Sequence, residues 1–159
     1  MILFTIGTQK QSFKRLFNYI DSLNIKEQII IQGGKGRFSF KNPNIEYYDF
    51  FNYDEMNQKI DEARIIITHG GGGTIFKALE KGKKVIVVPR LKEYKEHIND
   101  HQLEITKYLV DNNYVLMALT KEELINNINI IEKHKFSKYY NNNENFILKI
   151  EKEINSLLN

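Results

Sequence analysis

Residues 65–102 read IIITHGGGGTIFKALEKGKKVIVVPRLKEYKEHINDHQ, and this stretch decides the fold. A β-branched run at Ile65–Ile67 ends just before four consecutive glycines, and a helical pattern opened by Thr74 follows them. A second apolar run, Val85–Val88, ends at a polar loop that leads to a helix beginning near His101. A strand, a glycine turn, a helix, a second strand, a polar turn and a second helix are typical of a parallel α/β sheet.

The rest of the chain continues this alternation. Apolar runs predict further strands at 2–6, 28–32, 45–48 and 114–119. Apolar residues at helical spacing predict further helices at about 12–23, 54–63, 120–131 and 144–158. The residues expected to cap the first three of these are Ser12, Asp54 and Thr120, the last in a capping box with Glu123. The predicted fold is α/β, a Rossmann-like, mostly parallel sheet with helices on both faces, and residues 1–159 form a single domain that includes a C-terminal helix at about 144–158.

Composition limits the class of protein. The chain has 159 residues, 42% of them hydrophobic and 27% charged, which predicts a folded soluble domain. It has no Cys, so disulfides and thiolate chemistry are excluded. A formal charge of +3 is too mild to indicate nucleic-acid binding, but it suits an anionic small molecule.

The sequence predicts a cytoplasmic location. No apolar run approaches the roughly 20 residues that cross a bilayer. The first residues, MILFTIGT, have no basic segment before the apolar ones, so they are interpreted as a strand and not as a signal peptide. Any contact with a membrane is expected to occur through a partner or a surface patch.

The glycine turn Gly70–Gly73 predicts an anion site. Glycines permit backbone conformations that other residues avoid, and they leave the main chain unobstructed. The free amides and the positive dipole end of the next helix suit a phosphate, at the carboxyl edge of the sheet. A tight turn without a ligand is the alternative. The turn is not a P-loop, because no Gly-Lys-Ser/Thr ends it, and no Gly-x-Ser-x-Gly elbow supports a hydrolase.

The polar segment before the last helix of this stretch offers a second set of ligands. His97 and His101 are four residues apart, but Ile98 follows the first histidine where a metalloprotease has glutamate, and no third ligand is evident, so no metal is expected. Asp100, His101 and Gln102 provide the acceptors and donors that sugar hydroxyls need. The alternative is a plain helix N-terminus capped by Asn99 or Asp100.

These residues form a pattern. His69-Gly70-Gly71, Gly82-Lys83, Ile86-Val87-Val88-Pro89-Arg90 and Glu96-His97-Ile98-Asn99-Asp100-His101-Gln102 together resemble the glycosyltransferase family 28 C-terminal domain. The nearest resemblance is to donor-binding subunits of two-part bacterial exopolysaccharide or capsule glycosyltransferases. A more distant one is to the catalytic subunit of the eukaryotic dolichol-linked UDP-GlcNAc transferase. The likeness extends from the first strand to about Val110, and residues 96–102 are its most specific part.

The resemblance implies the sugar-nucleotide half of an inverting GT-B glycosyltransferase that uses a UDP-sugar and needs no cofactor. The glycine turn would hold the diphosphate, residues 100–102 the donor sugar, and the loop at Phe50-Phe51 would lie near the uracil. Arg90 would add positive charge near the phosphates, with a surface ion pair as its alternative role. The donor-binding residues expected on this basis are Gly7, Thr8, Phe51, His69, Gly70, Gly71, Gly72, Gly73, Thr74, Lys77, Arg90, His97, Asn99, Asp100, His101 and Gln102.

The sequence departs from the family pattern at one position. Family members carry a ribose-binding glutamate three residues after the threonine of the glycine turn, where this chain has Lys77. Glu80 lies one turn further along the predicted helix. Ribose recognition by a carboxylate at the usual position is therefore not expected, although an ammonium suits a diphosphate.

The chain also lacks the acceptor-binding half of a GT-B enzyme. The resemblance implies that a membrane-anchored partner subunit supplies it and that the acceptor is a lipid-linked saccharide at the inner membrane face. The general base is either His69 or a residue of the partner. Two other interpretations remain: a non-catalytic nucleotide-binding module with a regulatory or scaffolding role, and sugar-nucleotide epimerisation, against which the single-domain length argues. Galactose, glucuronic acid and N-acetylglucosamine are all compatible with the motifs.

Overall fold

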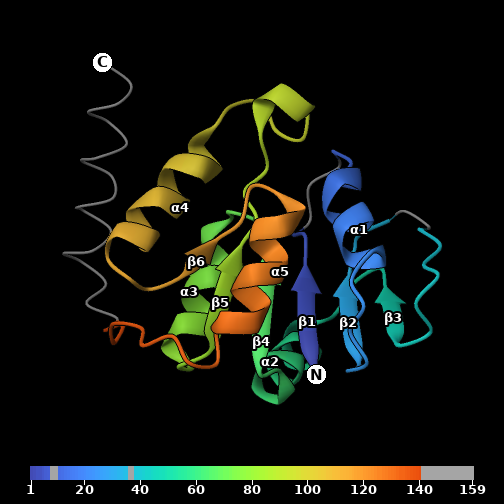
Figure 1. Ribbon diagram of the computed structural model, residues 1–159, viewed down its shortest axis with the longest axis horizontal. Helices are drawn as coiled ribbons and strands as arrows, with labels where there is room; N and C mark the ends of the chain where they lie inside the picture. The colour runs from blue at the N-terminus through green and yellow to red at the C-terminus, as the bar shows by residue number, and fades with distance from the viewer. Residues whose placement is uncertain (8–10, 36–37, 141–159) are drawn as a thin grey trace.

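The computed structural model describes residues 1–7, 11–35 and 38–140. Within these ranges six strands form one parallel sheet in the order β3-β2-β1-β4-β5-β6 (Figure 1). The strands are β1 (Ile2–Thr5), β2 (Ile29–Gln32), β3 (Ile45–Tyr48), β4 (Ile65–Thr68), β5 (Lys84–Val87) and β6 (Leu116–Met117). This order is that of a Rossmann fold, and its direction reverses between β1 and β4, so the predicted fold class is confirmed.

Helices cover both faces of the sheet (Figure 1). The α-helices are α1 (Lys14–Asp21), α2 (Tyr53–Glu62), α3 (Gly72–Glu80), α4 (His101–Asp111) and α5 (Lys121–Ile130), and a 3-10 turn, η1, spans Lys92–Tyr94. One apolar core joins α1 and α5 to the side chains of Ile2 and Phe4 in β1, and a second joins α2, α3 and α4 to the alternate residue Leu3. The central strands β1, β2 and β4 are fully buried, as expected for a sheet covered on both sides.

Several predicted boundaries were wrong by a few residues. The last strand, expected over 114–119, is only Leu116–Met117. Helix α2 begins after Asn52 and not at Asp54, because Asn52 and Glu55 form a reciprocal capping box. Ser12 does not cap α1, whose N-cap residue is Phe13, a buried residue that anchors the helix by packing. The capping box at Thr120 and Glu123 is confirmed. The predicted C-terminal helix at 144–158 lies outside the described residues.

The helix after the glycine turn also begins earlier than predicted. We expected Thr74 to open it, but α3 starts at Gly72 with Gly71 as its N-cap residue. The start is fixed by a contact within the turn, because the Gly71 amide donates a hydrogen bond to Nδ1 of His69, two residues earlier (2.9 Å), and is held in place before the helix begins. Within the described residues, no helix combines the length and apolar character needed to cross a membrane.

Candidate donor-binding site at the carboxyl edge of the sheet

The helix N-termini at the carboxyl edge differ in how they are capped. Helices α2 and α5, which follow the outermost strands β3 and β6, each begin with a capping box. Helices α1, α3 and α4 follow the central strands β1, β4 and β5, and none has a side-chain cap at its N-cap residue. An uncapped N-terminus leaves backbone amides available to a ligand. The open termini therefore gather at the centre of the edge, where the strand order reverses and ligands bind in such folds.

Helix α3 has the barest of these N-termini. Its first turn has no acidic residue and consists of Gly72, Gly73 and Thr74. Gly73 is exposed, and a Cβ atom added to it would meet nothing within 4 Å. This combination of unfilled space, free amides and positive dipole end can accept a phosphate group.

The reason for the four glycines is not the one expected. None of Gly70–Gly73 has a positive φ angle, so unusual backbone conformation does not explain them. Instead, three of them are closely approached by neighbours. A Cβ atom would collide with Gln102 at Gly70, with the His69 ring at Gly71 and with the Phe76 ring at Gly72. The glycines allow side chains to pack directly against the turn.

His69 lies between two of the turns at this edge. A Cβ atom added at Gly71 on one side of the ring, or at Gly7 on the other, would collide with it. Gly7 also has a φ of +71°. Nδ1 accepts the Gly71 amide, so the ring proton of the neutral form is on Nε2. Burial, helped by the charge of Arg90, lowers the pKa of His69 to about 4. The imidazole is therefore neutral at physiological pH.

Gln102 joins the ends of β4 and β5. Its side-chain Oε1 accepts hydrogen bonds from the backbone amides of Gly70 and Arg90, both at 3.1 Å. These two amides lie just beyond the paired residues of the two strands, so the side-chain carbonyl extends the ladder by one more link. The side chain is buried, and its oxygen is committed to this contact.

Arg90 is the fully buried cation behind the glycine turn. Its Nη1 donates to the carbonyl oxygens of Gln11 and Glu96, and its Nη2 donates to that of Ile6. Its Nε has no hydrogen-bond partner within the described part of the chain. Burial lowers the pKa of Arg90 to about 10, so it remains charged at neutral pH. The surface ion pair considered as its alternative role is excluded, because Arg90 is buried and binds main-chain carbonyls.

Lys77 points toward the neighbouring loop. Its Nζ lies 3.9 Å from the ring centroid of Tyr53, the first residue of α2, and this ring is 75% exposed. Glu80 ends α3, where its charge, added to burial, raises the pKa of Tyr139. It therefore lies at the opposite end of α3 from the glycine turn. The first charged residue of α3 is thus a half-buried cation.

The sequence profile of the glycosyltransferase family 28 C-terminal domain matches residues 1–158. The chain belongs to this family.

Curated relatives agree with this assignment. A stretch of 95 residues, 57% of this chain, is 34% identical to the human protein named UDP-N-acetylglucosamine transferase subunit ALG13, of which it covers 8%. A stretch of 102 residues, 64% of this chain, is 32% identical to the Candida albicans protein of the same name, of which it covers 33%. The family 28 chain thus corresponds to a third or less of the length of these relatives.

Solved structures support the fold. The Acinetobacter baumannii MurG structure has a TM-score of 0.58 at 20% identity, with 81% of this chain matching 40% of that one. The Methanocaldococcus jannaschii UDP-GlcNAc 2-epimerase, solved with UDP-GlcNAc and UDP, has a TM-score of 0.61 at 17% identity, with 99% of this chain matching 44% of that one. At these identities the likeness establishes the architecture only.

The loop before α4 contains several other residues that were predicted to bind the donor. Asp100 is the N-cap residue, but its carboxylate accepts the Lys92 amide (2.9 Å) and not an amide of the helix. The Asn99 side chain accepts the His101 amide at 3.4 Å, and His97 Nδ1 lies 3.1 Å from the Asn99 carbonyl oxygen. These contacts shape the loop, and the half-exposed rings of His97 and His101 remain beside it.

The two histidines have different partners. His101 Nδ1 lies 3.1 Å from Glu104 Oε2, whereas His97 contacts the Asn99 main chain. Among the described residues no group of three His, Asp or Glu side chains is arranged to hold a metal ion.

The remaining residues predicted to bind the donor are Phe51, Gly7 and Thr8. Phe51 is buried in the core and packs on Tyr48, with ring centroids 4.8 Å apart, whereas its neighbour Phe50 is 65% exposed. Of the two phenylalanines, Phe50 is therefore the exposed one. Gly7 lies against His69 at the centre of the edge, and Thr8 is outside the described residues.

The sequence analysis missed a partly buried ion pair at this edge. Arg15 of α1 binds both carboxylate oxygens of Glu96, at 3.0 and 2.8 Å. Glu96 also accepts the Leu91 amide, and the Glu96 carbonyl accepts Arg90. Glu96 belongs to the segment 96–102 on which the family resemblance most depends, so the sequence marked it as important. Its partner Arg15 could not be identified from the sequence, because it lies 81 residues away.

The first prediction compares two glycines of the turn. Gly71→Ala forces a methyl group into the His69 ring and should lower the free energy of unfolding by about 1–3 kcal/mol. Gly73→Ala faces open space and should leave it unchanged or raise it by up to about 1 kcal/mol. Urea denaturation of the two variants measures the difference, and equal effects would contradict the packing explanation.

The second prediction concerns pH. The folded pKa of His69, about 4, lies below the ordinary value of 6.5, so the unfolded chain binds this proton first and stability falls as pH drops through this window. His69 should account for a loss of about 3 kcal/mol between pH 6.5 and pH 4. His69→Asn, which keeps a side-chain acceptor for Gly71, should flatten the curve of unfolding free energy against pH. Parallel curves for the two proteins would show that His69 titrates normally.

Proposed function

We propose that this chain is the donor-binding, catalytic subunit of an inverting UDP-sugar glycosyltransferase. The observation that carries the proposal is the open N-terminus of α3 at the point where the strand order reverses. Membership of the glycosyltransferase family 28 C-terminal domain family gives the reaction class, and the printed name of the ALG13 relatives indicates UDP-N-acetylglucosamine as the donor to test first.

The donor's diphosphate would bind the amides of Gly72, Gly73 and Thr74. The charge of Arg90, buried behind the turn, would favour the anion through the low-dielectric interior without touching it. The base and ribose would lie toward the loop between β3 and α2, where Phe50 and Tyr53 are exposed and Lys77 replaces a ribose-binding carboxylate. The sugar would face the half-exposed His97 and His101 beside the loop before α4.

The structure favours a partner residue as the general base. The unprotonated nitrogen of neutral His69 is Nδ1, and the Gly71 amide already occupies it. A pKa of about 4 also makes His69 a weak base at neutral pH. We therefore assign His69 to holding the glycine turn, and the acceptor's proton would pass to a residue of the second subunit.

The second subunit is proposed because the curated relatives are named as transferase subunits. The partner would be membrane-anchored and would present a lipid-linked saccharide at the cytoplasmic face. Capsule or exopolysaccharide synthesis is the biological context we propose.

The third prediction tests the donor site. In a helix each Cβ atom tilts toward the N-terminus, so a methyl group at Gly73 intrudes where the diphosphate would bind. Calorimetry should show UDP binding by the wild type and binding weaker by about tenfold or more for Gly73→Ala. Lys81→Ala, at the far end of the same helix, is the control and should bind UDP as the wild type does. Gln102→Ala is unsuitable, because it leaves two buried amides unpaired.

An assay of sugar transfer separates the enzyme from a non-catalytic nucleotide-binding module. The purified chain should bind UDP but transfer sugar only when the membrane partner is co-expressed. Failure of the wild type to bind UDP at millimolar concentration would refute the donor site. Binding of UDP without turnover in the presence of the partner would favour the regulatory or scaffolding module.

A further inference from the structure

The η1 loop, which we define as residues 91–98, lies beyond the carboxyl ends of the strands and contains His97 (Figure 1). The residue that ends η1 is Lys95, and its φ of +55° lies in the left-handed region that residues other than glycine rarely adopt. A non-glycine residue keeps such a conformation only where the surrounding contacts hold it. The shape of the η1 loop therefore depends on contacts with the rest of the protein.

Glu96 is the residue through which the loop is held, and it is only 3% exposed. Its carboxylate accepts the Leu91 amide (3.1 Å), and its own amide donates to the Leu91 carbonyl oxygen (3.2 Å), so the two ends of the turn are joined. Its carbonyl oxygen accepts a hydrogen bond from Arg90. Because a carboxylate buried to this degree needs a counter-charge, the shape of the loop depends on the cation that pairs with Glu96.

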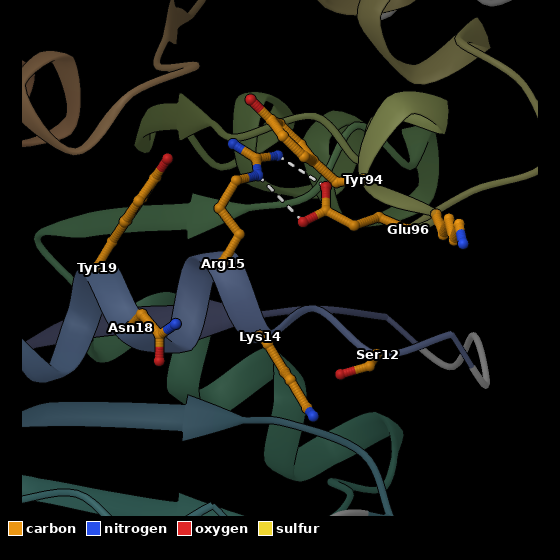
Figure 2. Close-up of a pocket in the computed structure, with 8 residues that line it drawn as sticks. Ser12, Lys14, Arg15, Asn18, Tyr19, Tyr94 and Glu96 are labelled. Carbon is orange, nitrogen blue, oxygen red and sulfur yellow. Dashed lines mark hydrogen bonds and ion pairs between the residues drawn. The ribbon is translucent and has the colours of Figure 1, made fainter.

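That cation is Arg15 of α1. Figure 2 shows it extending from the helix to the Glu96 carboxylate, which it binds with two hydrogen bonds of 3.0 and 2.8 Å. The guanidinium lies 5.1 Å from the centroid of the Tyr94 ring, and it also donates to the carbonyl oxygens of Leu119 (2.9 Å) and Pro89 (2.8 Å). A planar guanidinium with several partners fixes their relative positions, which a lysine ammonium does not. Arg15 therefore attaches the η1 loop to α1 in one defined position.

The glycine turn has a separate support. Gln102 joins it to the end of β5, because the Gln102 side chain accepts the amides of Gly70 and Arg90. Arg15 takes part in neither of these hydrogen bonds. A change at Arg15 can therefore move the η1 loop while the first turn of α3 keeps its position.

We propose that Arg15 is a positioning residue for the sugar end of the donor site. It acts through Glu96, which precedes His97 in the chain, and so places His97 against the sugar. The inference rests on the proposed function, in which the sugar faces His97 and the diphosphate binds the first turn of α3. It extends that function, because the hexose and the diphosphate are recognised by parts of the site that have different supports. Arg15 thus determines the affinity for a UDP-sugar relative to the affinity for UDP.

The experiment measures binding of UDP and of UDP-N-acetylglucosamine to the full chain by calorimetry. Arg15→Lys keeps a positive charge near Glu96 but loses the two-pronged contact. Its UDP affinity should stay within about twofold of the wild type, whereas its affinity for the UDP-sugar should fall by about fivefold or more, because a displaced loop loses hydrogen bonds to the sugar. In the ¹⁵N-labelled wild type, the amides of His97 and Ile98 should shift with the UDP-sugar and not with UDP.

Arg64→Lys is the matched control. Arg64 also binds both carboxylate oxygens of a glutamate, Glu27, at 2.8 and 2.9 Å, but it precedes β4 at the amino edge of the sheet, so this variant should leave both affinities unchanged. A second variant serves if Arg15→Lys does not fold. Arg15→Gln combined with Glu96→Gln removes both charges together, so that neither is left buried without a partner, and it should show the same selective loss of UDP-sugar affinity.

Three results would overturn the proposal: the folded Arg15 variant weakens UDP and the UDP-sugar in parallel, it leaves both affinities unchanged, or Arg64→Lys causes the same selective loss. Failure of the proposed function is distinguishable, because the wild type would then bind neither nucleotide at millimolar concentration, and the assignment of Arg15 would be refuted together with the donor site. Failure of the Arg15 assignment alone leaves UDP bound at the first turn of α3.

Discussion

The two hydrogen bonds accepted by the Gln102 side chain determine the arrangement of the carboxyl edge. They fix the positions of Gly70 and Arg90 relative to each other once β4 and β5 have ended. His69 can then lie between Gly7 and Gly71, and Arg90 can reach the carbonyl oxygens of the loops that follow β1 and β5. Removing the Gln102 oxygen leaves two buried amides unpaired, so three loops depend on one side chain.

This junction explains why the open helix N-termini lie where they do. The outer helices α2 and α5 satisfy their own first amides with capping boxes. The start of α3, beside the junction, is positioned by the partly buried hydrogen bond between Gly71 and His69, and so it needs no capping side chain. Its amides are left for a ligand, which connects the packing of the fold to the proposed binding of a sugar nucleotide.

Much of this architecture was predictable from the sequence. Unbroken apolar runs such as Ile65–Ile67 identify buried parallel strands, and Thr120 with Glu123 marks a helix start, because both signals are local. The role of Gln102 was predicted as sugar contact, yet its oxygen joins two strands, and Arg15 was missed because Glu96 lies 81 residues away. Phe51 and Phe50 have the same local signal, and only the tertiary fold decides which of them is buried. The contacts that shape the site connect distant segments, and local patterns do not encode such contacts.

The central claim is that main-chain amides of the first turn of α3 bind the diphosphate of a uridine nucleotide. Titration of the ¹⁵N-labelled chain with UDP, followed by amide chemical shifts, tests it most directly. The account predicts that the largest shifts occur at Gly72, Gly73 and Thr74, and that the first-turn amides of the capped helix α5 do not move. Saturable UDP binding with the largest shifts elsewhere, and none in the first turn of α3, would contradict it.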